Sequence, residues 1–399
     1  MSQDTLIDEA GVPQYKLPDL FDGKPNPQYW ADRRRELLET FAEHVYGRTP
    51  LEAPEGGWGP TVRSREAAPF AEATRIQFRI QVGPPGNRHA VALLLYLPEK
   101  RKGPVPVFLG LNFSGNHTIH TDPGISLPES WMFPWDGTGV VDHRATEAGR
   151  GTRAHRWPVE RILERGYGLA TLYCGDLAPD QQGHPRISSF RELFAPAPDP
   201  QSEWGNLGIW AWSLSRAREA ISALAEVDAH RIIAIGHSRM GKAALWAAAQ
   251  DPLFAAAISN NSGCLGAALS RRKFGETVAK ISKGFPHWFC PRLSTYAERE
   301  EQMPVDQHML LALIAPRPLY VSSASEDLWA DPRGEFLAAV EASAAYRLFG
   351  HEGIAGTEFP EVEAPLHGDR IGYHIRRGTH NMLRYDWERF MDFMDKQWE

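Results

Sequence analysis

Cysteine is scarce in this chain of 399 residues, which has only Cys174, Cys264 and Cys290. An odd and sparse set is not a disulfide framework, so we expect buried thiols, with one chance disulfide as the alternative. Long apolar runs are also missing, since none approaches the 18 residues that a membrane-spanning helix needs. The sequence therefore predicts no membrane partner.

Positive charge is in short supply as well, with 43 Lys and Arg against 50 Asp and Glu and a formal net charge of −7. A nucleic-acid-binding protein would show a basic stripe, so that class is excluded. The first residues are acidic and polar and have neither the basic nor the apolar part of a signal peptide. We expect a cytoplasmic protein, or a secreted or periplasmic one if a leader has been removed, so localisation stays open.

The usual patterns for metals and phosphates are absent. The 15 histidines form no H-E-x-x-H pair, and His117 and His120 stand at a loop spacing, which argues against zinc. No glycine-rich phosphate loop occurs. The sequence therefore predicts no metal, no cofactor and no obligatory protein partner.

What the chain does contain is a regular alternation of apolar strands and helices. We expect an irregular arm at residues 1–30 and a single domain at residues 31–399. The predicted strands are 74–82 (a half-buried antiparallel edge), 91–97, 106–111, 169–173, 231–235, 255–259, 319–323 and 347–349. The predicted helices are 30–46, 158–165, 207–226, 242–250, 331–343 and 381–397. This order predicts an α/β three-layer sandwich, with a mostly parallel central sheet and helices on both faces.

Residues 119–156 interrupt the alternation with a stretch rich in Gly, Pro, Trp and His. Loops of this length inside compact domains are usually functional. We therefore expect a long loop insertion near an active site.

The strongest local pattern is RIIAIGHSRMGKAALWAAA at residues 231–249. A predicted strand runs into Ser238 and then directly into a helix, which is the context of a nucleophile elbow in α/β hydrolases. Gly236 and Gly241 suit the strained turn, although the second glycine stands one position later than in G-x-S-x-G. A plain strand-to-helix turn is the alternative.

A serine nucleophile needs a base and an acid, which follow it along the chain in α/β hydrolases. His380 lies just before the last helix, where the base is expected; the alternative is that it only caps this helix. Asp327 follows the strand at 319–323 and is the first choice for the acid. We expect Glu326 to point to solvent and Asp331 to cap the next helix.

The oxyanion hole of such a site needs two backbone donors. One is the N–H of Arg239, the residue after the nucleophile, and the other comes from an earlier loop, for which residues 112–117 (NFSGNH) are suited. The guanidinium of Arg239 either aids the oxyanion or forms a salt bridge on the elbow helix.

With these residues, the chain resembles a known family. Gly236–Lys242, GHSRMGK, is similar to the G-C-S-R-x-G-K signature of glucuronoyl esterases, and the likeness runs from about Val107 to the end. The supporting segments are LGLNFSGNHT, GDLAPD, WAWSLSRA, NNSGCLGAALSRR, FGE, SSASEDLWADP and IGYHIRRGTHNMLRYDW. The resemblance implies an α/β-hydrolase fold in which Ser238, His380 and Arg239 serve as nucleophile, base and oxyanion ligand.

The same resemblance implies the substrate. These carbohydrate esterases cleave the ester between 4-O-methyl-glucuronic acid on xylan and lignin alcohols, through a glucuronoyl-enzyme. Lys242 and Glu276 would bind ring hydroxyls, and Trp329 would line the pocket. From the residues alone, they could equally be a solvated lysine, a surface charge and a core aromatic. Arg271 and Arg272 either favour an acidic substrate or only pair locally.

Two departures from the family pattern matter. His237 replaces the cysteine of the signature, so the disulfide known beside the nucleophile in fungal members cannot form. Residues 260–263 (NNSG) carry no carboxylate where fungal members have their catalytic glutamate. The acid is therefore expected at Asp327, as in some bacterial relatives.

Two other functions stay open from the sequence. One is an acetyl xylan, sugar or alkyl esterase that uses the same triad. The other is a non-catalytic carbohydrate-binding protein on a hydrolase scaffold.

Overall fold

The computed structural model describes residues 5–50 and 52–398. Residues 1–4 of the expected arm, together with Leu51 and Glu399, lie outside the described residues. The chain forms two compact units, each considered by itself. Unit 1 comprises residues 1–48, 197–208 and 235–399, and unit 2 comprises residues 49–196 and 209–234. The single domain that the sequence predicts for residues 31–399 stays a prediction.

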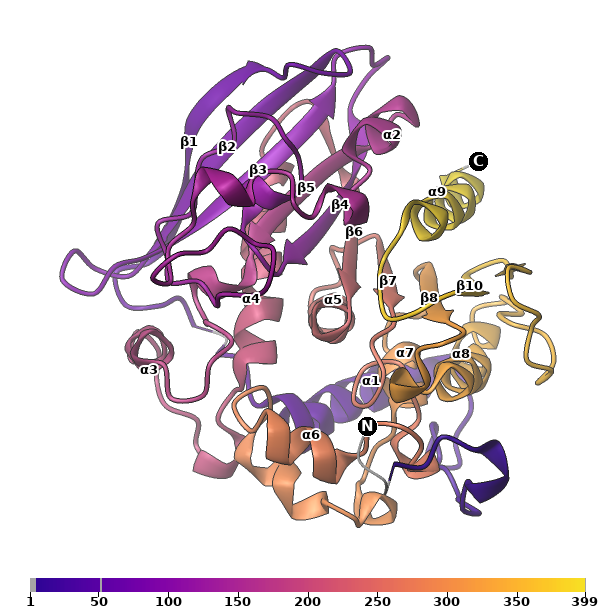
Figure 1. Ribbon diagram of the computed structural model, residues 1–399. Helices are drawn as coiled ribbons and strands as arrows, with labels where there is room; N and C mark the ends of the chain where they lie inside the picture. The colour runs from indigo at the N-terminus through magenta and orange to yellow at the C-terminus, as the bar shows by residue number, and fades with distance from the viewer. Residues whose placement is uncertain (1–4, 51, 399) are drawn as a thin grey trace. The chain divides into compact units, whose positions relative to one another are not determined.

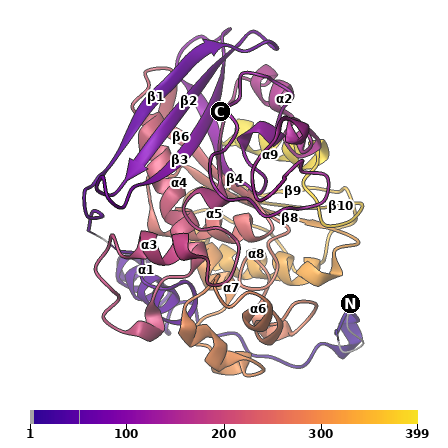
Figure 2. The same cartoon turned by 60° about the vertical axis from the view of Figure 1, so that its left-hand side comes forward.

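Unit 2 is built on long antiparallel strands (Figure 2). Its strands follow the order β1-β2-β3-β5-β4; the pairs β1–β2, β2–β3 and β3–β5 are antiparallel, and the β4–β5 pair is parallel. The strands are β1 (Trp58–Ala67), β2 (Ala73–Val82), β3 (His89–Pro98), β4 (Val105–Asn112) and β5 (Gly168–Tyr173), and the helices are α2 (Val159–Glu164) and α3 (Pro185–Arg191).

The expected edge strand at 74–82 is wrong in its position, although its antiparallel pairing is confirmed. Strand β2 pairs with β1 on one side and with β3 on the other, so it is internal. The alternation that suggested an edge is real, since the apolar residues of β2 are buried and the polar ones half-buried. The sequence did not predict strand β1, because most of its residues are exposed and it has no apolar run.

Two elements pass from one unit into the other along the chain. The helix α4 (Asn206–Ser222) begins in unit 1 and continues in unit 2, and the strand β6 (Val227–His237) begins in unit 2 and ends in unit 1. Its last residue, His237, stands directly before Ser238. The long loop at 119–156 is confirmed, with short 3-10 turns at Glu147–Gly149 and Ala154–Arg156.

Unit 1 carries the strand order β7-β8-β10-β9. The pairs β7–β8 and β8–β10 are parallel and the short β9 is antiparallel. The elements are β7 (Ala256–Asn260), β8 (Leu319–Ala324), β9 (Leu366–His367), β10 (Ile371–Arg376), α1 (Pro27–Phe41), a π turn (Ala42–Tyr46), α5 (Arg239–Gln250), α6 (Val278–Gly284), α7 (Gln307–Ala312), α8 (Pro332–Arg347) and α9 (Arg384–Trp398).

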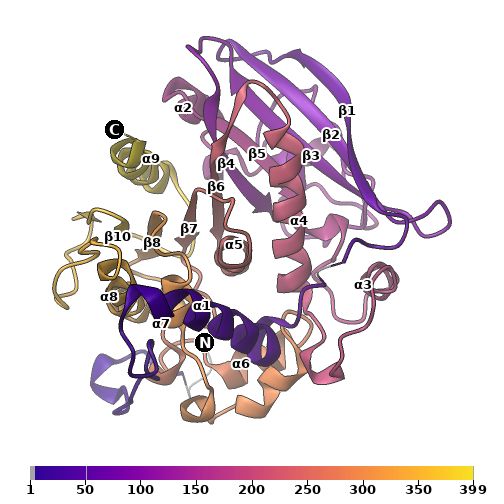
Figure 3. The same cartoon turned by 180° about the vertical axis from the view of Figure 1, so that it is seen from behind.

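Helices cover both faces of these strands. Helix α9 lies on one face, against β10, while α5 and α8 lie on the other, and α1 runs beside α7 (Figures 1 and 3). Aromatic packing fixes the π turn after α1 to α5, because the Tyr46 and Trp246 rings stack with centroids 4.7 Å apart. The short strand expected at 347–349 is wrong: these residues end α8 and form its C-terminal turn.

The register of the parallel strands decides where the site can form. Arg376 at the end of β10 lies opposite Ala324 at the end of β8, and Asn260 at the end of β7 lies opposite Ser322. The three strands therefore end at one edge, and their loops leave side by side. In open α/β sheets this carboxyl edge is where ligand sites form.

Candidate active site

Ser238 stands on a sharp turn between β6 and α5. Its backbone has φ 58° and ψ −132°, a conformation that a residue with a side chain rarely adopts. Its N–H donates a hydrogen bond of 2.8 Å to the carbonyl of Asn260 at the end of β7. A Cβ on Gly236 would lie 2.1 Å from the Met240 carbonyl oxygen, so only glycine fits there. This is the strand–serine–helix turn that the sequence predicts.

The displaced second glycine also has a packing role. A Cβ on Gly241 would approach the Cβ of Ser262 to 3.0 Å and the Gly236 carbonyl oxygen to 3.1 Å. The G-x-S-x-x-G spacing thus brings the first turn of α5 close to the strand end. Arg239 opens this helix, and its guanidinium carbon lies 5.4 Å from the ring centroid of Trp288, at cation–π distance.

His380 and Asp327 meet where the loops after β10 and β8 come together. The Nδ1 of His380 lies 2.5 Å from Oδ2 of Asp327. A carboxylate can only accept a hydrogen bond, so the Nδ1 atom of His380 carries the ring proton. The Nε2 atom of His380 is then the one that can accept a proton. The Asp327 side chain is 4% exposed and that of His380 is 42% exposed, so the carboxylate is buried and the imidazole faces outward.

Backbone hydrogen bonds hold the two loops together. The N–H of Ser325 donates a hydrogen bond of 2.9 Å to the Arg376 carbonyl, and the N–H of Glu326 donates one of 2.9 Å to the Gly378 carbonyl. The Glu326 side chain is exposed, as expected. Asp331 caps α8 as expected, because its side chain accepts from the N–H of Gly334.

His237, the residue before Ser238, contacts His380. The rings of His237 and His380 lie 4.5 Å apart at an angle of 42°. His237 Nδ1 lies 2.6 Å from Oδ1 of Asn260, which fixes the His237 ring. This contact brings the elbow and the base together within unit 1.

Lys242, Glu276 and Trp329 form a cluster beside the base. Lys242 is buried, and its Nζ lies 3.7 Å from Oε2 of Glu276 and donates 2.7 Å to the Ser262 carbonyl. The N–H of Glu276 donates 2.9 Å to the Trp329 carbonyl. Burial raises the pKa of Glu276, while Lys242, Trp329 and His380 act to lower it. His380 is therefore within electrostatic reach of this carboxyl.

The burial of these three residues excludes the non-functional alternatives that the sequence left open, while their part in sugar binding stays a prediction. The side chains of Lys242 and Glu276 are 4% and 9% exposed, so neither is a solvated surface charge. Trp329 is 37% exposed, so it is not a core aromatic. A buried lysine–glutamate pair beside an exposed indole offers a donor, an acceptor and an apolar face to one ligand.

Arg271 and Arg272 pair locally. Arg271 donates to Asp306 and to main-chain carbonyls, including that of Val305. Arg272 binds Asp331. Both arginines are buried and hold loops, so neither is available to attract an acidic substrate.

The segment expected to give the second oxyanion donor lies in unit 2. Asn112 ends β4 and residues 113–117 follow as a tight loop, in which the Gly115 N–H donates a hydrogen bond of 2.7 Å to Oδ1 of Asn112. Gly115 has φ 90°, and a Cβ there would lie 2.9 Å from the Pro128 side chain. Its part in an oxyanion hole stays a prediction.

Sequence reasoning missed two residues that support the site, Asn261 beside Asp327 and Asn260 beside the Ser238 turn. Asn261 donates 2.8 Å to Oδ2 of Asp327, and Asn260 binds the elbow and its histidine. Both lie in the NNSG segment after β7, where the resemblance pointed to a carboxylate and the sequence has amides. A polar pair at the carboxyl end of a buried strand was the available signal.

Three further features of the described residues concern the cysteines, metal ligands and membrane-spanning helices. Within the described residues, the three cysteines are buried and form no disulfide, which confirms the expected buried thiols. Across residues 5–50 and 52–398, no three His, Cys, Asp or Glu side chains gather as metal ligands would. In the same part of the chain, no helix has the length and apolar character to cross a membrane.

Comparison with known proteins decides the family. The chain is 44% identical over 398 residues to the carbohydrate esterase MZ0003 from an unknown prokaryotic organism, and the match covers 97% of this chain and 91% of the relative. A family model described as fungal glucuronyl esterase matches residues 159–350. The chain belongs to the glucuronoyl esterase family of carbohydrate esterases.

Solved structures of family members agree over the whole chain. A glucuronoyl esterase from Solibacter usitatus is 43% identical with a TM-score of 0.90, and the match covers 98% of this chain and 100% of that one. A promiscuous CE15 esterase from a marine bacterial metagenome is 42% identical, with a TM-score of 0.92 and the same coverage. The fold is therefore that of the α/β hydrolases, as the sequence predicts, and membership makes this chain a carbohydrate esterase.

Proposed function

We propose that this chain hydrolyses esters of glucuronic or 4-O-methyl-glucuronic acid with a Ser238–His380–Asp327 triad. The 2.5 Å contact between His380 and Asp327, beside a strained serine turn, is the observation that carries the proposal. Names of relatives support the substrate, since one solved relative is a glucuronoyl esterase and several curated ones are 4-O-methyl-glucuronoyl methylesterases.

The reaction follows from the roles of the three residues. His380 takes the proton of the Ser238 hydroxyl, and the oxygen attacks the ester carbonyl of the uronic acid. The tetrahedral oxyanion is stabilised by Arg239 and by backbone N–H groups at the start of α5; one lost donor of this kind typically costs about 100–1000-fold in rate. The bond to the alcohol breaks, His380 returns the proton to the leaving oxygen, and water then releases the acid by the same steps.

The buried pair beside the base fits the sugar. Lys242 can donate to a ring hydroxyl and Glu276 can accept from one, while Trp329 presents an exposed apolar ring. The natural substrate we propose is the ester that joins glucuronoxylan to lignin alcohols.

A second candidate is a broader esterase acting on sugar acetates or alkyl esters. The solved relative described as promiscuous favours it. The two candidates differ in whether the sugar hydroxyls contribute to transition-state binding.

An ester panel tests the proposal. We expect the kcat/KM for methyl 4-O-methyl-glucuronate to exceed that for methyl galacturonate, acetylated xylan and a simple alkyl ester. A higher kcat/KM on acetylated xylan or the alkyl ester would favour the second candidate. Failure of a fluorophosphonate to label Ser238, together with no turnover of any ester, would favour a non-catalytic carbohydrate-binding protein.

A further inference from the structure

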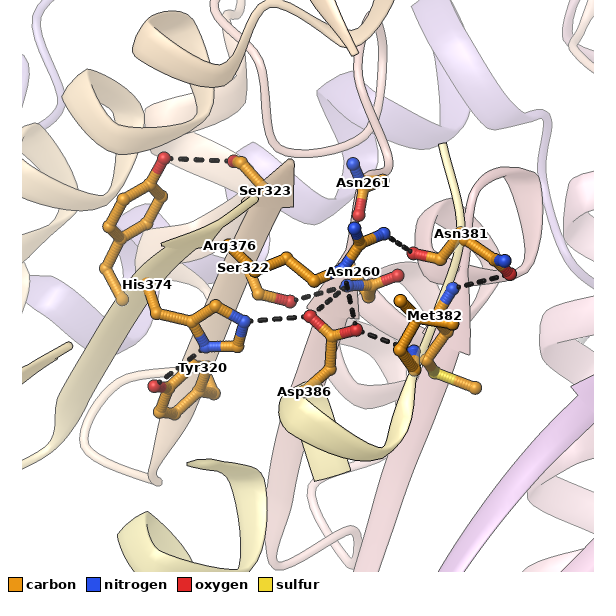
Figure 4. Close-up of polar contacts among 12 residues, drawn as sticks. Asn260, Asn261, Tyr320, Ser322, Ser323, His374, Arg376, Asn381, Met382 and Asp386 are labelled. Carbon is orange, nitrogen blue, oxygen red and sulfur yellow. Dashed lines mark hydrogen bonds and ion pairs between the residues drawn. The ribbon is translucent and has the colours of Figure 1, made fainter. Parts of the chain in front are cut away.

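Three charged or titratable side chains are buried behind the base, at the end of β10 and the start of α9. His374 and Asp386 are fully buried and Arg376 is 2% exposed (Figure 4). Such groups are rarely buried unless they are paired, and breaking a buried pair is costly. None of the three belongs to the triad or to the cluster of Lys242, Glu276 and Trp329 (the sugar cluster). Their arrangement therefore needs its own explanation.

The guanidinium of Arg376 binds the main chain on both sides of His380. Its Nη2 donates 2.8 Å to the Thr379 carbonyl and 2.6 Å to the Asn381 carbonyl. Its Nη1 donates 2.9 Å to the Arg377 carbonyl. The planar fork of arginine can reach several acceptors at fixed angles, which the single ammonium of lysine cannot do. The carbonyls of the turn that carries His380 are thus held by one side chain, that of Arg376.

Asp386 holds this guanidinium from the opposite side. Its Oδ2 accepts 3.0 Å from Nε of Arg376 and 2.7 Å from the N–H of Leu383, which caps the first turn of α9. Its Oδ1 lies 2.8 Å from Nε2 of His374. Burial lowers the pKa of His374, so the imidazole stays neutral and donates from Nε2.

Asn260 connects the same carboxylate to the nucleophile turn. Its Nδ2 donates 2.9 Å to Ser322 Oγ and 3.4 Å to Oδ1 of Asp386 (Figure 4). Its Oδ1 binds His237, and its carbonyl accepts from the N–H of Ser238. One chain of buried hydrogen bonds therefore runs from the elbow, through Asn260 and Asp386, to Arg376 and the turn of the base.

We propose that Arg376 is a positioning residue for His380, and that Asp386 sets the guanidinium in place. The inference rests on the proposed function, in which His380 is the base. The His380 side chain is 42% exposed, and among the residues that the structure describes its ring makes one hydrogen bond, to Asp327, and one ring contact, with His237. Its direction therefore depends on the backbone of residues 377–381. A misplacement of about 1 Å in such a group can cost about 100-fold in rate.

Two variants separate positioning from stability. Arg376→Lys keeps a positive charge beside Asp386 but cannot hold three carbonyls, so we expect a small loss of Tm and about a 10–100-fold loss of kcat. Asp386→Asn leaves the guanidinium buried without a countercharge but keeps its carbonyl bonds, so we expect a larger loss of Tm and a smaller loss of kcat. KM should change little in both, because the sugar cluster is untouched.

Tyr373→Phe is the matched control. Tyr373 is buried on the same strand; its hydroxyl donates a hydrogen bond of 3.0 Å to the Pro332 carbonyl and lies 3.0 Å from Ser323 Oγ, away from residues 377–381. The variant loses the polar contacts of this buried hydroxyl, so we expect a lower Tm with kcat within about twofold of the parent.

The direct readout is the proton that His380 shares with Asp327. Its downfield Nδ1–H resonance in the proton NMR spectrum should be present in the parent and in Tyr373→Phe, and lost or broadened in Arg376→Lys. Arg376→Lys with unchanged kcat and resonance, or kcat losses that follow Tm across all three variants, would overturn the inference. Failure of the proposed function would appear separately, as full activity of Ser238→Ala.

Discussion

Asn261 donates a hydrogen bond of 2.8 Å to Oδ2 of Asp327, the same oxygen that lies 2.5 Å from Nδ1 of His380. The carboxylate is thereby held by a neutral amide on one side and presented to the imidazole on the other. Since Asp327 is 5% exposed, water does not compete strongly for it. Asn261 comes from the segment after β7, where the family resemblance led us to expect a carboxylate, and it binds the carboxylate that we propose as the acid.

The first prediction concerns the acid. Asp327→Asn should lower kcat by about 10³–10⁴-fold, because an amide no longer fixes the imidazole in the tautomer that accepts the serine proton. Glu326→Gln is the control, since its side chain is exposed and it should stay within about threefold of the parent. Steady-state kinetics on a glucuronate ester would check both, and a larger effect of Glu326→Gln would move the acid to that residue.

The second prediction concerns the sugar. Glu276→Gln and Lys242→Met should each lower kcat/KM on a glucuronate ester by about 10–150-fold, since a charged hydrogen bond contributes about 1.5–3 kcal/mol. The loss should shrink on an alkyl ester that lacks the ring hydroxyls. Trp329→Ala should weaken binding of both esters more evenly, because it removes apolar contact. Equal losses on the two esters in Glu276→Gln and Lys242→Met would mean that these residues hold the scaffold.

The third prediction concerns pH and the buried Glu335. Its carboxylate accepts 2.6 Å from Ser323 Oγ and 2.9 Å from the Gly263 N–H, yet burial raises its pKa to about 8, with repulsion from Asp327 adding to the shift. Below about pH 4.5 the carboxyl is protonated in both the folded and the unfolded chain. Between about pH 4.5 and pH 8 the unfolded chain releases the proton first, so the free energy of unfolding falls with rising pH and levels off above this window.

Glu335→Gln should remove this dependence. Relative to the parent, the variant should gain on the order of a few kcal/mol in the free energy of unfolding between pH 5 and pH 8. Denaturant unfolding of both proteins at the two pH values gives the difference. A parallel pH dependence in parent and variant would show that Glu335 is ionised in the folded protein.

Much of the fold could be predicted because its strands are buried and apolar. Strands β3, β4, β5, β7 and β8 and helices α1, α4, α5, α8 and α9 lie within a few residues of their predicted places, where periodicity and turn residues agree. The turn at Ser238 and the places of His380 and Asp327 could also be predicted, since each stands at the end of a strand or near the start of a helix. Their catalytic roles stay a prediction.

Strand β10 was missed for a physical reason. Its sequence, IGYHIR, contains His374 and Arg376, which a hydrophobic pattern assigns to the surface. Both are buried because Asp386, on the following helix, accepts from each of them. A pairing of this kind depends on the tertiary fold and leaves no periodic signal in the chain. The same holds for Glu335, whose partners come from β8 and the loop after β7.

The activity of Ser238→Ala on methyl 4-O-methyl-glucuronate tests the account most directly, with thermal unfolding measured on the same sample. The substitution removes only the hydroxyl from a turn fixed by Gly236, Asn260 and the start of α5. We predict a loss of kcat/KM of at least about 10⁴-fold with an unchanged Tm. Retained hydrolysis by a variant with the parent's Tm would remove Ser238 from the mechanism and contradict the account.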